Sequence, residues 1–270
     1  MIMRKVYLIA LCLAASSCTA AGLLHPEPEV NPEGTSLLQV SFVDSEIWTE
    51  QDAVGVYGSL KGDNSKFVPM SSCWGSEGQA TLYGSPVEGL LRAYYPYDPA
   101  GLPCIAEGLV PLSSLQKYCP DARSHFRVNG IAAGEGEAGS LVLRYIAGAV
   151  HFRVEAQFTG EVKKVELSSL NDVLSGMLTM QDGKVSSGTG SVTVRGVGSP
   201  QGPFDIWFLL PEGAYKGLEL TIVTDAGEVV KAVSGTLPVY MGKVSETVVK
   251  DETYEYAGSA YEIIAGEFDR

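Results

Sequence analysis

One cysteine near the start of the chain has the surroundings that lipid attachment requires. Cys18 ends the stretch 15–18, Ala-Ser-Ser-Cys, which follows a basic start at Arg4 and Lys5 and an apolar run over residues 6–15. This pattern is typical of a bacterial export signal that ends in a small-small-Cys site, where the cysteine is acylated and becomes the new N-terminus. The sequence therefore predicts a lipoprotein signal peptide over residues 1–17 and a lipid anchor at Cys18.

The same segment leaves one alternative open and argues against another. Ala15 stands where a leucine is usual, which leaves an ordinary signal peptide and a freely secreted product as the alternative. A transmembrane helix is not expected, because the apolar run covers only residues 6–15 and a spanning helix needs about 20 residues.

A glycine pattern typical of nucleotide binding is surrounded by residues that do not suit a nucleotide site. Gly134, Gly136 and Gly139 match G-x-G-x-x-G, which in a nucleotide-binding enzyme opens a helix beneath a pyrophosphate. Here a predicted strand follows, and Glu135 and Glu137 would repel a phosphate. The pattern therefore predicts no nucleotide site.

The histidines do not form a catalytic or metal-binding group. His25, His125 and His151 are scattered, and His151 lies inside a predicted strand, where a structural role is expected. The sequence has no G-x-S-x-G, H-E-x-x-H or calcium-loop pattern. No catalytic residue, no metal ligand and no cofactor is therefore predicted, and the protein is not expected to be an enzyme.

Three cysteines remain after Cys12 and Cys18 are assigned to the signal and the anchor. In an oxidising compartment Cys104 could pair with Cys119 and leave Cys73 free. The alternative is that all three are small buried apolar residues.

An aromatic cluster over residues 94–97, Tyr-Tyr-Pro-Tyr, invites two interpretations. Its rings could form a stacking platform for sugars, together with Trp74. The preferred interpretation is that the rings end a strand and pack over the rim of a β-sandwich.

Composition and charge narrow the class further. The net charge is −13 and the isoelectric point is about 4.7, which opposes binding to nucleic acid, so no nucleic-acid partner is expected. Hydrophobic residues make up 45% of the chain, with 31 glycines and 14 prolines, as in a packed, turn-rich protein. The length after the signal suits two domains.

Alternation of apolar and polar residues predicts β-strands along most of the chain. It begins with Leu38, Val40 and Phe42 on one face and continues at spacings of about ten residues, with turn residues between the runs. The further runs cover residues 53–57, 90–95, 141–145, 149–154, 162–167, 191–194, 204–210, 218–223, 229–233 and 244–249. Only residues 111–118 could form one or two helical turns. The predicted fold class is all-β, with antiparallel sandwiches.

The predicted domain boundaries follow from composition. Residues 18–36 hold three prolines and several acidic residues and suit an extended tether. The Gly-rich stretch 129–139 is the expected hinge. It divides the rest into an N-terminal β-domain over residues 37–133 and a C-terminal β-domain over residues 134–270.

Several of these segments resemble the fimbrillin family of Bacteroides-type bacteria. The resemblance rests on Trp48 ahead of Asp52-Ala53-Val54-Gly55-Val56-Tyr57, on Ala-Tyr-Tyr-Pro-Tyr at 93–97, on the strand pair 141–152, on Leu-Ser-Ser at 167–169 with Ser-Gly at 175–176, and on Phe-Leu-Leu-Pro at 208–211. It covers nearly the whole mature chain. It implies a lipoprotein precursor with two transthyretin-like β-sandwiches in tandem, anchored in the outer membrane by Cys18 and exposed at the cell surface in a fimbrium.

The resemblance also implies assembly with other fimbrial subunits by strand exchange, and a host protein or glycan as a further partner. In the family, a protease cuts after a basic residue near the N-terminus and removes the first strand, and a strand of the next subunit fills the groove. This chain has no Lys or Arg between Cys18 and Lys61, so a trypsin-like cut cannot free the strand 37–43 alone.

The residues expected to carry the exchange lie at both ends of the mature chain. Leu38, Val40 and Phe42 either fill the groove or compete for it. The tail 251–270 is a donor candidate, and its alternative role is to close the second sandwich. Its donor residues are Tyr254, Tyr256, Tyr261 and Ile263. The alternative function is a surface glycan-binding lipoprotein that never polymerises and uses Tyr94, Tyr95 and Trp74.

Overall fold

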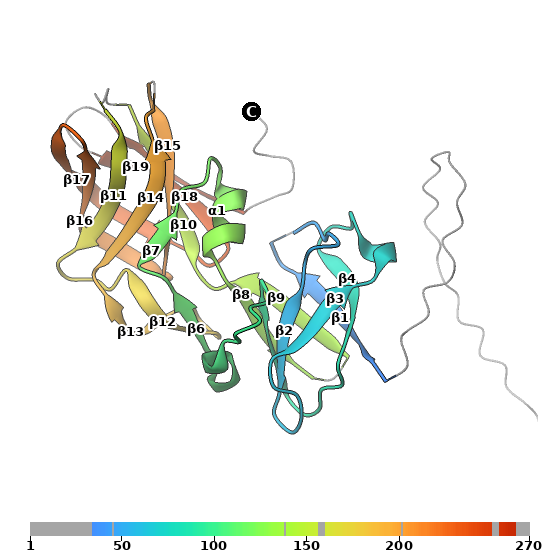
Figure 1. The fold of residues 1–270 in the computed structure, drawn as a ribbon. Coiled ribbons are helices and arrows are strands. Elements are labelled where there is room, and N and C mark those ends of the chain that lie inside the picture. The colour runs from blue at the N-terminus through green and yellow to red at the C-terminus, as the bar shows by residue number, and fades with distance from the viewer. Residues whose placement is uncertain are drawn as a thin grey trace, which may run out of the picture. The chain divides into compact units, whose positions relative to one another are not determined.

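The computed structural model describes residues 34–44, 46–137, 139–155, 160–200, 202–249 and 254–262, with residues 247–249 and 254–262 described by their backbone alone. Strands dominate these residues, so the prediction of an all-β fold is confirmed (Figure 1). The predicted signal peptide, with Cys18 and most of the tether, lies outside the described residues. The last residues assigned to the tether, 34–36, lead directly into the first strand, β1 (Ser36–Phe42).

The first sheet closes into a seven-stranded barrel. Its order is β1, β4 (Gln79–Gly84), β3 (Ser65–Pro69), β2 (Val54–Gly58), β5 (Leu91–Tyr95), β8 (Ala132–Gly136) and β9 (Ser140–Tyr145). Neighbouring strands run antiparallel except β1 and β9, whose parallel pairing closes the barrel. Alternate residues of each strand point inward, as the period-two pattern requires, and the interior is filled by side chains.

The second sheet has nine strands and holds most of the C-terminal half of the chain. Its order is β15 (Phe204–Leu210), β10 (Gly148–Val154), β18 (Lys243–Val249), β19 (Tyr254–Glu262), β17 (Gly227–Val239), β16 (Gly213–Thr224), β11 (Val162–Ser169), β14 (Ser191–Gly198) and β7 (Leu115–Lys117). One buried cluster takes residues from both halves of this sheet, among them Phe152 and Phe208 from one half and Leu167 and Leu220 from the other. The two halves therefore share a single core.

A three-stranded sheet and three short helices complete the described structure. The small sheet has the order β13 (Val185–Thr189), β12 (Ser175–Thr179) and β6 (Leu109–Leu112). The helices are η1 (Ser71–Cys73), η2 (Pro103–Glu107) and α1 (Ala122–Asn129). Asp121 is the N-cap of helix α1, and its carboxylate accepts a hydrogen bond of 2.8 Å from the Ser124 N–H.

The prediction of helical turns over residues 111–118 is wrong. The segment forms the end of β6 and then β7, and its buried residues Leu112 and Gln116, like Val110 just before it, recur at even spacing. The helix α1 follows a few residues later. Its apolar residues Ala122 and Phe126 are buried one helical turn apart, a pattern too short to stand out in the sequence.

The Gly-rich stretch expected to be a hinge contains a strand. Residues 132–136 form β8, which pairs with β5 along its length. A Cβ atom on Gly134 would lie 1.9 Å from the Val142 carbonyl oxygen, so glycine is required there by the close approach of β9. The predicted boundary between residues 133 and 134 falls inside this strand, and the division into two domains stays a prediction.

The three remaining cysteines are free thiols. Of the two alternatives left open for these cysteines, the Cys104–Cys119 disulfide is therefore not formed. Cys119 is buried, and its thiol lies 3.7 Å from the Lys117 carbonyl oxygen and 3.9 Å from the Asn129 amide nitrogen. Cys104 belongs to η2 and, like Cys73, is only half-buried, so burial as a small apolar residue fits Cys119 alone.

Candidate functional site

The first strand, expected to take part in strand exchange, is a central strand of the barrel. Residues 36–41 pair antiparallel with residues 79–84 of β4, and residues 39–42 pair parallel with residues 140–143 of β9. The side chains of Leu38, Val40 and Phe42 are 2%, 1% and 6% exposed, so the predicted inward face is confirmed. Removing β1 would open the barrel between two strands and uncover its core.

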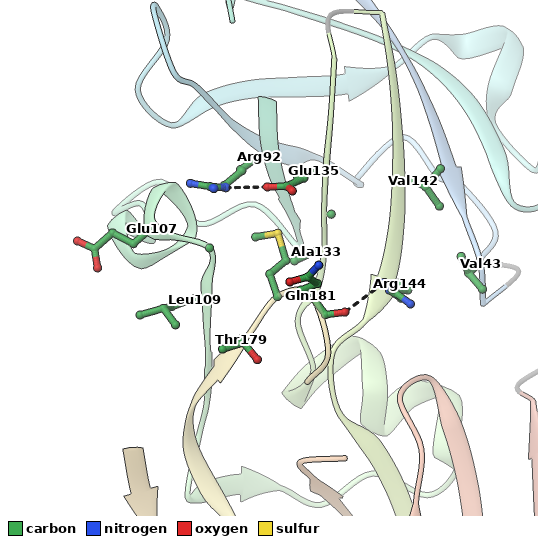
Figure 2. A pocket seen from close by; sticks show the side chains of 13 residues that line it. Val43, Arg92, Glu107, Leu109, Ala133, Glu135, Val142, Arg144, Thr179 and Gln181 are labelled. Atoms are coloured by element: carbon green, nitrogen blue, oxygen red, sulfur yellow. Dashed lines mark hydrogen bonds and ion pairs between the residues drawn. The ribbon is translucent and has the colours of Figure 1, made fainter. Parts of the chain in front are cut away.

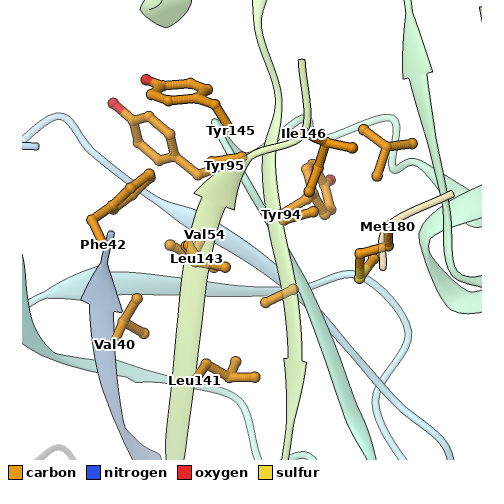
Figure 3. Close-up of a cluster of buried hydrophobic side chains, with 14 of the residues drawn as sticks. Val40, Phe42, Val54, Tyr94, Tyr95, Leu141, Leu143, Tyr145, Ile146 and Met180 are labelled. Atoms are coloured by element: carbon orange, nitrogen blue, oxygen red, sulfur yellow. The ribbon is translucent and has the colours of Figure 1, made fainter. Parts of the chain in front are cut away.

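Phe42 connects β1 to a buried aromatic cluster. Its ring centroid lies 5.5 Å from Trp48, 5.3 Å from Tyr95 and 5.9 Å from Tyr145. These separations suit tilted and edge-on aromatic contacts. Figure 3 shows the side chains of β1 beside those of β9 and this cluster, including Val40, Phe42, Leu141, Leu143, Tyr95 and Tyr145.

The segment after β1 is attached to the same cluster through two carboxylates. Asp44 accepts a hydrogen bond of 2.9 Å from the Tyr145 N–H, and Glu46 accepts one of 2.9 Å from the Tyr145 hydroxyl. Glu46 also lies 3.5 Å from the Arg127 guanidinium and 3.6 Å from that of Arg123. Burial raises the pKa of Glu46, and the two arginines oppose that rise. Asp44 and Glu46, which follow β1, thus connect this segment to β9 by hydrogen bonds and to α1 by ion pairs.

Asp52 is the centre of this polar network. Its carboxylate accepts hydrogen bonds from the Thr49 N–H at 2.7 Å, the Tyr95 hydroxyl at 2.7 Å and the Arg127 guanidinium at 3.0 Å. Burial raises the pKa of the Tyr95 hydroxyl, and Asp52 as hydrogen-bond acceptor raises it further. In the sequence, Asp52 and Trp48 stand out only as parts of the fimbrillin-like pattern. The signal that could have identified Asp52 is its position directly before an apolar run. A charged residue in that position can be buried when its carboxylate is hydrogen-bonded, as it is here.

The C-terminal tail occupies the middle of the nine-stranded sheet. Residues 254–262 form β19, which lies between β18 and β17. The pairing with β18 is antiparallel and extends from Lys243 to Val249, whereas the pairing with β17 is parallel and joins only Val233 and Ser234 to the start of β19. Tyr254, Tyr256 and Tyr261 belong to β19, and Ile263 lies outside the described residues.

The two sets of predicted exchange residues therefore belong to different sheets. Leu38, Val40 and Phe42 lie in the barrel, and the three tyrosines lie in the nine-stranded sheet. A tail that pairs within its own sheet is the alternative that the sequence analysis left open for residues 251–270. The structure describes this arrangement within a single chain.

Two of the three aromatic residues assigned to the alternative glycan-binding function are buried. Tyr94 is fully buried, and its hydroxyl donates a hydrogen bond of 2.7 Å to the Asn64 side chain. Tyr95 is 4% exposed and binds Asp52. Both rings belong to the barrel core, and of the three residues only Trp74, 49% exposed, presents an aromatic surface.

The two histidines that the structure describes are held by packing and hydrogen bonds. His151 lies on β10, stacks on Trp207 at 4.7 Å and forms a hydrogen bond of 2.8 Å with Asp205. His125 is buried in α1. Within the described part of the chain no three His, Cys, Asp or Glu side chains gather as a metal site would require. No helix that the structure describes has the length and apolar character needed to span a membrane.

Together these features define an all-β protein whose first strand is locked into a barrel and whose last strand lies inside a second sheet. The crystal structure of a candidate cell adhesion protein from Bacteroides ovatus has the same fold, with a TM-score of 0.54 and 14% identity, covering 84% of this chain and 97% of that one. A candidate cell adhesion protein from Bacteroides uniformis aligns with a TM-score of 0.49 and 15% identity over 86% of this chain and 100% of the other. The tip fimbrial protein Mfa3 from Porphyromonas gingivalis, with a C-terminal truncation, aligns with a TM-score of 0.40 and 11% identity over 84% and 99%. No protein-family profile matches the chain, and no curated protein matches its sequence.

Proposed function

We propose that this protein is a fimbrillin-like cell-surface subunit that assembles with other fimbrial subunits by β-strand exchange and serves in cell adhesion. It is attached to the outer membrane by lipid on Cys18, with residues 18–36 as the tether. Its domains are two transthyretin-like β-sandwiches. Support comes from the fold shared with the Bacteroides ovatus protein and from the fimbrillin-like segments in the sequence.

The observation that carries the proposal is the position of β19. No strand that the structure describes follows β19, so its release would pull no later described strand out of the sheet. The one-sided pairing of β19, extensive with β18 and brief with β17, makes departure from the slot easier than for a strand held along both edges. Such a strand can be donated to a partner subunit, where main-chain hydrogen bonds provide affinity.

The position of β1 argues for a place at the end of a fibre. β1 is paired along both edges, its inward side chains are buried, and Asp44 and Glu46 tie the following segment to Tyr145. The absence of Lys and Arg between Cys18 and Lys61 removes the trypsin-like route for releasing β1. A subunit that keeps β1 donates its own strand or caps the fibre, so we assign it an anchor or tip role.

Engineered disulfides that hold β19 or β1 in place, and that a reductant opens again, test the proposal. Val248→Cys with Glu255→Cys places two thiols at paired positions of β18 and β19, and directly opposed residues of an antiparallel pair have the Cα separation that a disulfide needs. Gln39→Cys with Thr81→Cys does the same for β1 and β4, at exposed positions whose side chains already touch. Incorporation into fimbriae is measured in cells with and without reductant.

Locking β19 is expected to abolish incorporation under oxidising conditions, and reductant is expected to restore it. Locking β1 is expected to leave incorporation unchanged. Assembly that continues with β19 locked contradicts donation of this strand. Assembly blocked by the β1 lock contradicts retention of β1.

A further inference from the structure

A cavity of about 600 Å³ opens between the barrel, η2 and the turn after β12. Its size lies within the range of about 300–1,000 Å³ that is usual for small-molecule sites. The walls come from residues 133–135 of β8, from Val142 and Arg144 of β9, from residues 107–109 and from residues 179–181. Figure 2 shows these side chains around the opening.

The charges on the walls do not cancel locally. Arg92 is already paired, with its Nε 3.1 Å from a Glu135 carboxylate oxygen and a further hydrogen bond to the Ala106 carbonyl. Arg144 forms no ion pair within the part of the chain that the structure describes, and its guanidinium lies 3.5 Å from the Gln181 carbonyl oxygen. That distance is long for an N–H···O hydrogen bond, so the fork of guanidinium donors is free for another acceptor.

The neighbours of Arg144 complete a small binding surface. Gln181 is exposed beside it, and Figure 2 shows the two side chains together at the cavity. The carboxylate of Glu107, which also lines the cavity, points away from Arg144 in this view. The exposed apolar side chains of the lining are Val43 and Val142, at 60% and 54%, whereas Met180 and Ala133 are buried, at 7% and 1%.

We infer that this cavity binds a small carboxylate ligand, whose acid group pairs with Arg144 and whose aliphatic part lies against Val142. A planar guanidinium matches a carboxylate with two parallel hydrogen bonds, and the Gln181 side-chain amide supplies a further donor. The overall charge of −13 disfavours anions in general, so an acid that binds this protein needs a local cation of this kind. The cavity has no lining residue from β19, the strand proposed to be donated, and the inference does not depend on fimbrial assembly.

Two sources carry this chemistry, an acidic sugar and a glutamate side chain of a peptide. The test measures binding of glucuronate and of N-acetyl-glutamate methylamide to the full chain by calorimetry, each against its neutral counterpart, glucose or N-acetyl-glutamine methylamide. At least one acid is expected to bind while its neutral counterpart does not. Which acid binds identifies the source.

Arg144→Gln removes the charge at an exposed position and is expected to weaken binding by at least about tenfold, as loss of a charge-assisted pair does. Arg195→Gln, at an exposed position on β14 outside the cavity, is the matched control and is expected to bind like the original protein. Thermal unfolding of both variants confirms that they fold. The inference is overturned if neither acid binds, if Arg144→Gln binds as well as the original, or if both variants lose binding equally.

Discussion

The side-chain amide of Gln116 forms two hydrogen bonds with the main chain of a single residue, Leu209. Its Nε2 donates to the Leu209 carbonyl at 2.9 Å, and its Oε1 accepts from the Leu209 N–H at 2.9 Å. Gln116 belongs to β7 and Leu209 to β15, which are the two outer strands of the nine-stranded sheet. A carboxamide carries a donor and an acceptor like a peptide group, so this side chain covers part of an otherwise open edge.

Gln116→Leu should therefore destabilise the protein by about 3 kcal/mol or more, since it leaves the buried N–H and C=O of Leu209 without partners. Urea denaturation measures the change in the free energy of unfolding. Lys117→Ala, at an exposed position on the same strand, is the control and should change stability by less than about 0.5 kcal/mol. A Gln116→Leu variant as stable as the original would show that the edge does not need this cover.

His125 should make stability depend on pH in mildly acidic solution. Burial lowers its pKa to about 3, and the Asp121 carboxylate opposes this effect only in part. The ring is bonded as a neutral histidine, because the Asn129 amide donates to Nδ1 at 3.1 Å and Nε2 can donate to Gln116 at 2.9 Å.

The pKa of His125 in the folded state lies below the unfolded value of about 6.5, so the unfolded chain takes up the proton first as the pH falls. The stability that neutral His125 contributes is therefore fully present above pH 6.5 and is lost as the pH falls towards 3. Between pH 7 and pH 5 the stability of the original protein should fall by about 2 kcal/mol relative to His125→Gln. Denaturation of both proteins at the two pH values checks this. Equal pH dependence would mean that His125 titrates normally in the folded state.

Arg127 should be the most costly charged residue to remove. It lies 3.0 Å from Asp52 and 3.5 Å from Glu46, and both carboxylates are at most 8% exposed. Arg127→Met leaves these buried charges with less compensation, so a loss of about 3–5 kcal/mol is expected.

Two comparisons make the Arg127 prediction specific. The side chain of Arg153 is 49% exposed and paired with Glu155. Arg153→Met should therefore lower the free energy of unfolding by less than about 1 kcal/mol. Asp52→Asn should cost less in the Arg127→Met background than in the original protein, with a coupling of about 1–3 kcal/mol. If the two substitutions change the free energy of unfolding additively, the Arg127–Asp52 ion pair does not stabilise the folded protein.

Two glycines of the same sequence motif should respond differently to alanine. At Gly134 a Cβ atom would meet the Val142 carbonyl oxygen at 1.9 Å, a clash between two backbones, and a loss of about 3 kcal/mol or more is expected. At Gly139 nothing lies within 4 Å, but φ is +109°, so only backbone strain of about 1–2 kcal/mol is expected. Denaturant unfolding of the two variants gives the order, and the reverse order would contradict the packing explanation.

Local pattern predicted the parts of the fold that depend on one strand at a time. Leu38, Val40 and Phe42 share the buried face because a half-buried strand alternates its side chains. The same reasoning failed at β8, whose glycines are typical of a linker but are required by the closeness of β9. It also missed the contact between Asp52 and Arg127, which lie 75 residues apart, because no local pattern encodes a pair so distant.

The amino-acid sequence by itself determined that the chain is built of β-strands, where many of them run and which side of the first one faces a core. Only the tertiary structure decided which strands are neighbours: that β1 lies between β4 and β9, and that the chain-terminal strand lies between β18 and β17. The reason is that strands pair through main-chain groups that every residue except proline carries in full. Alternation along one strand therefore selects a face, whereas the partner is selected by how all the buried faces pack together.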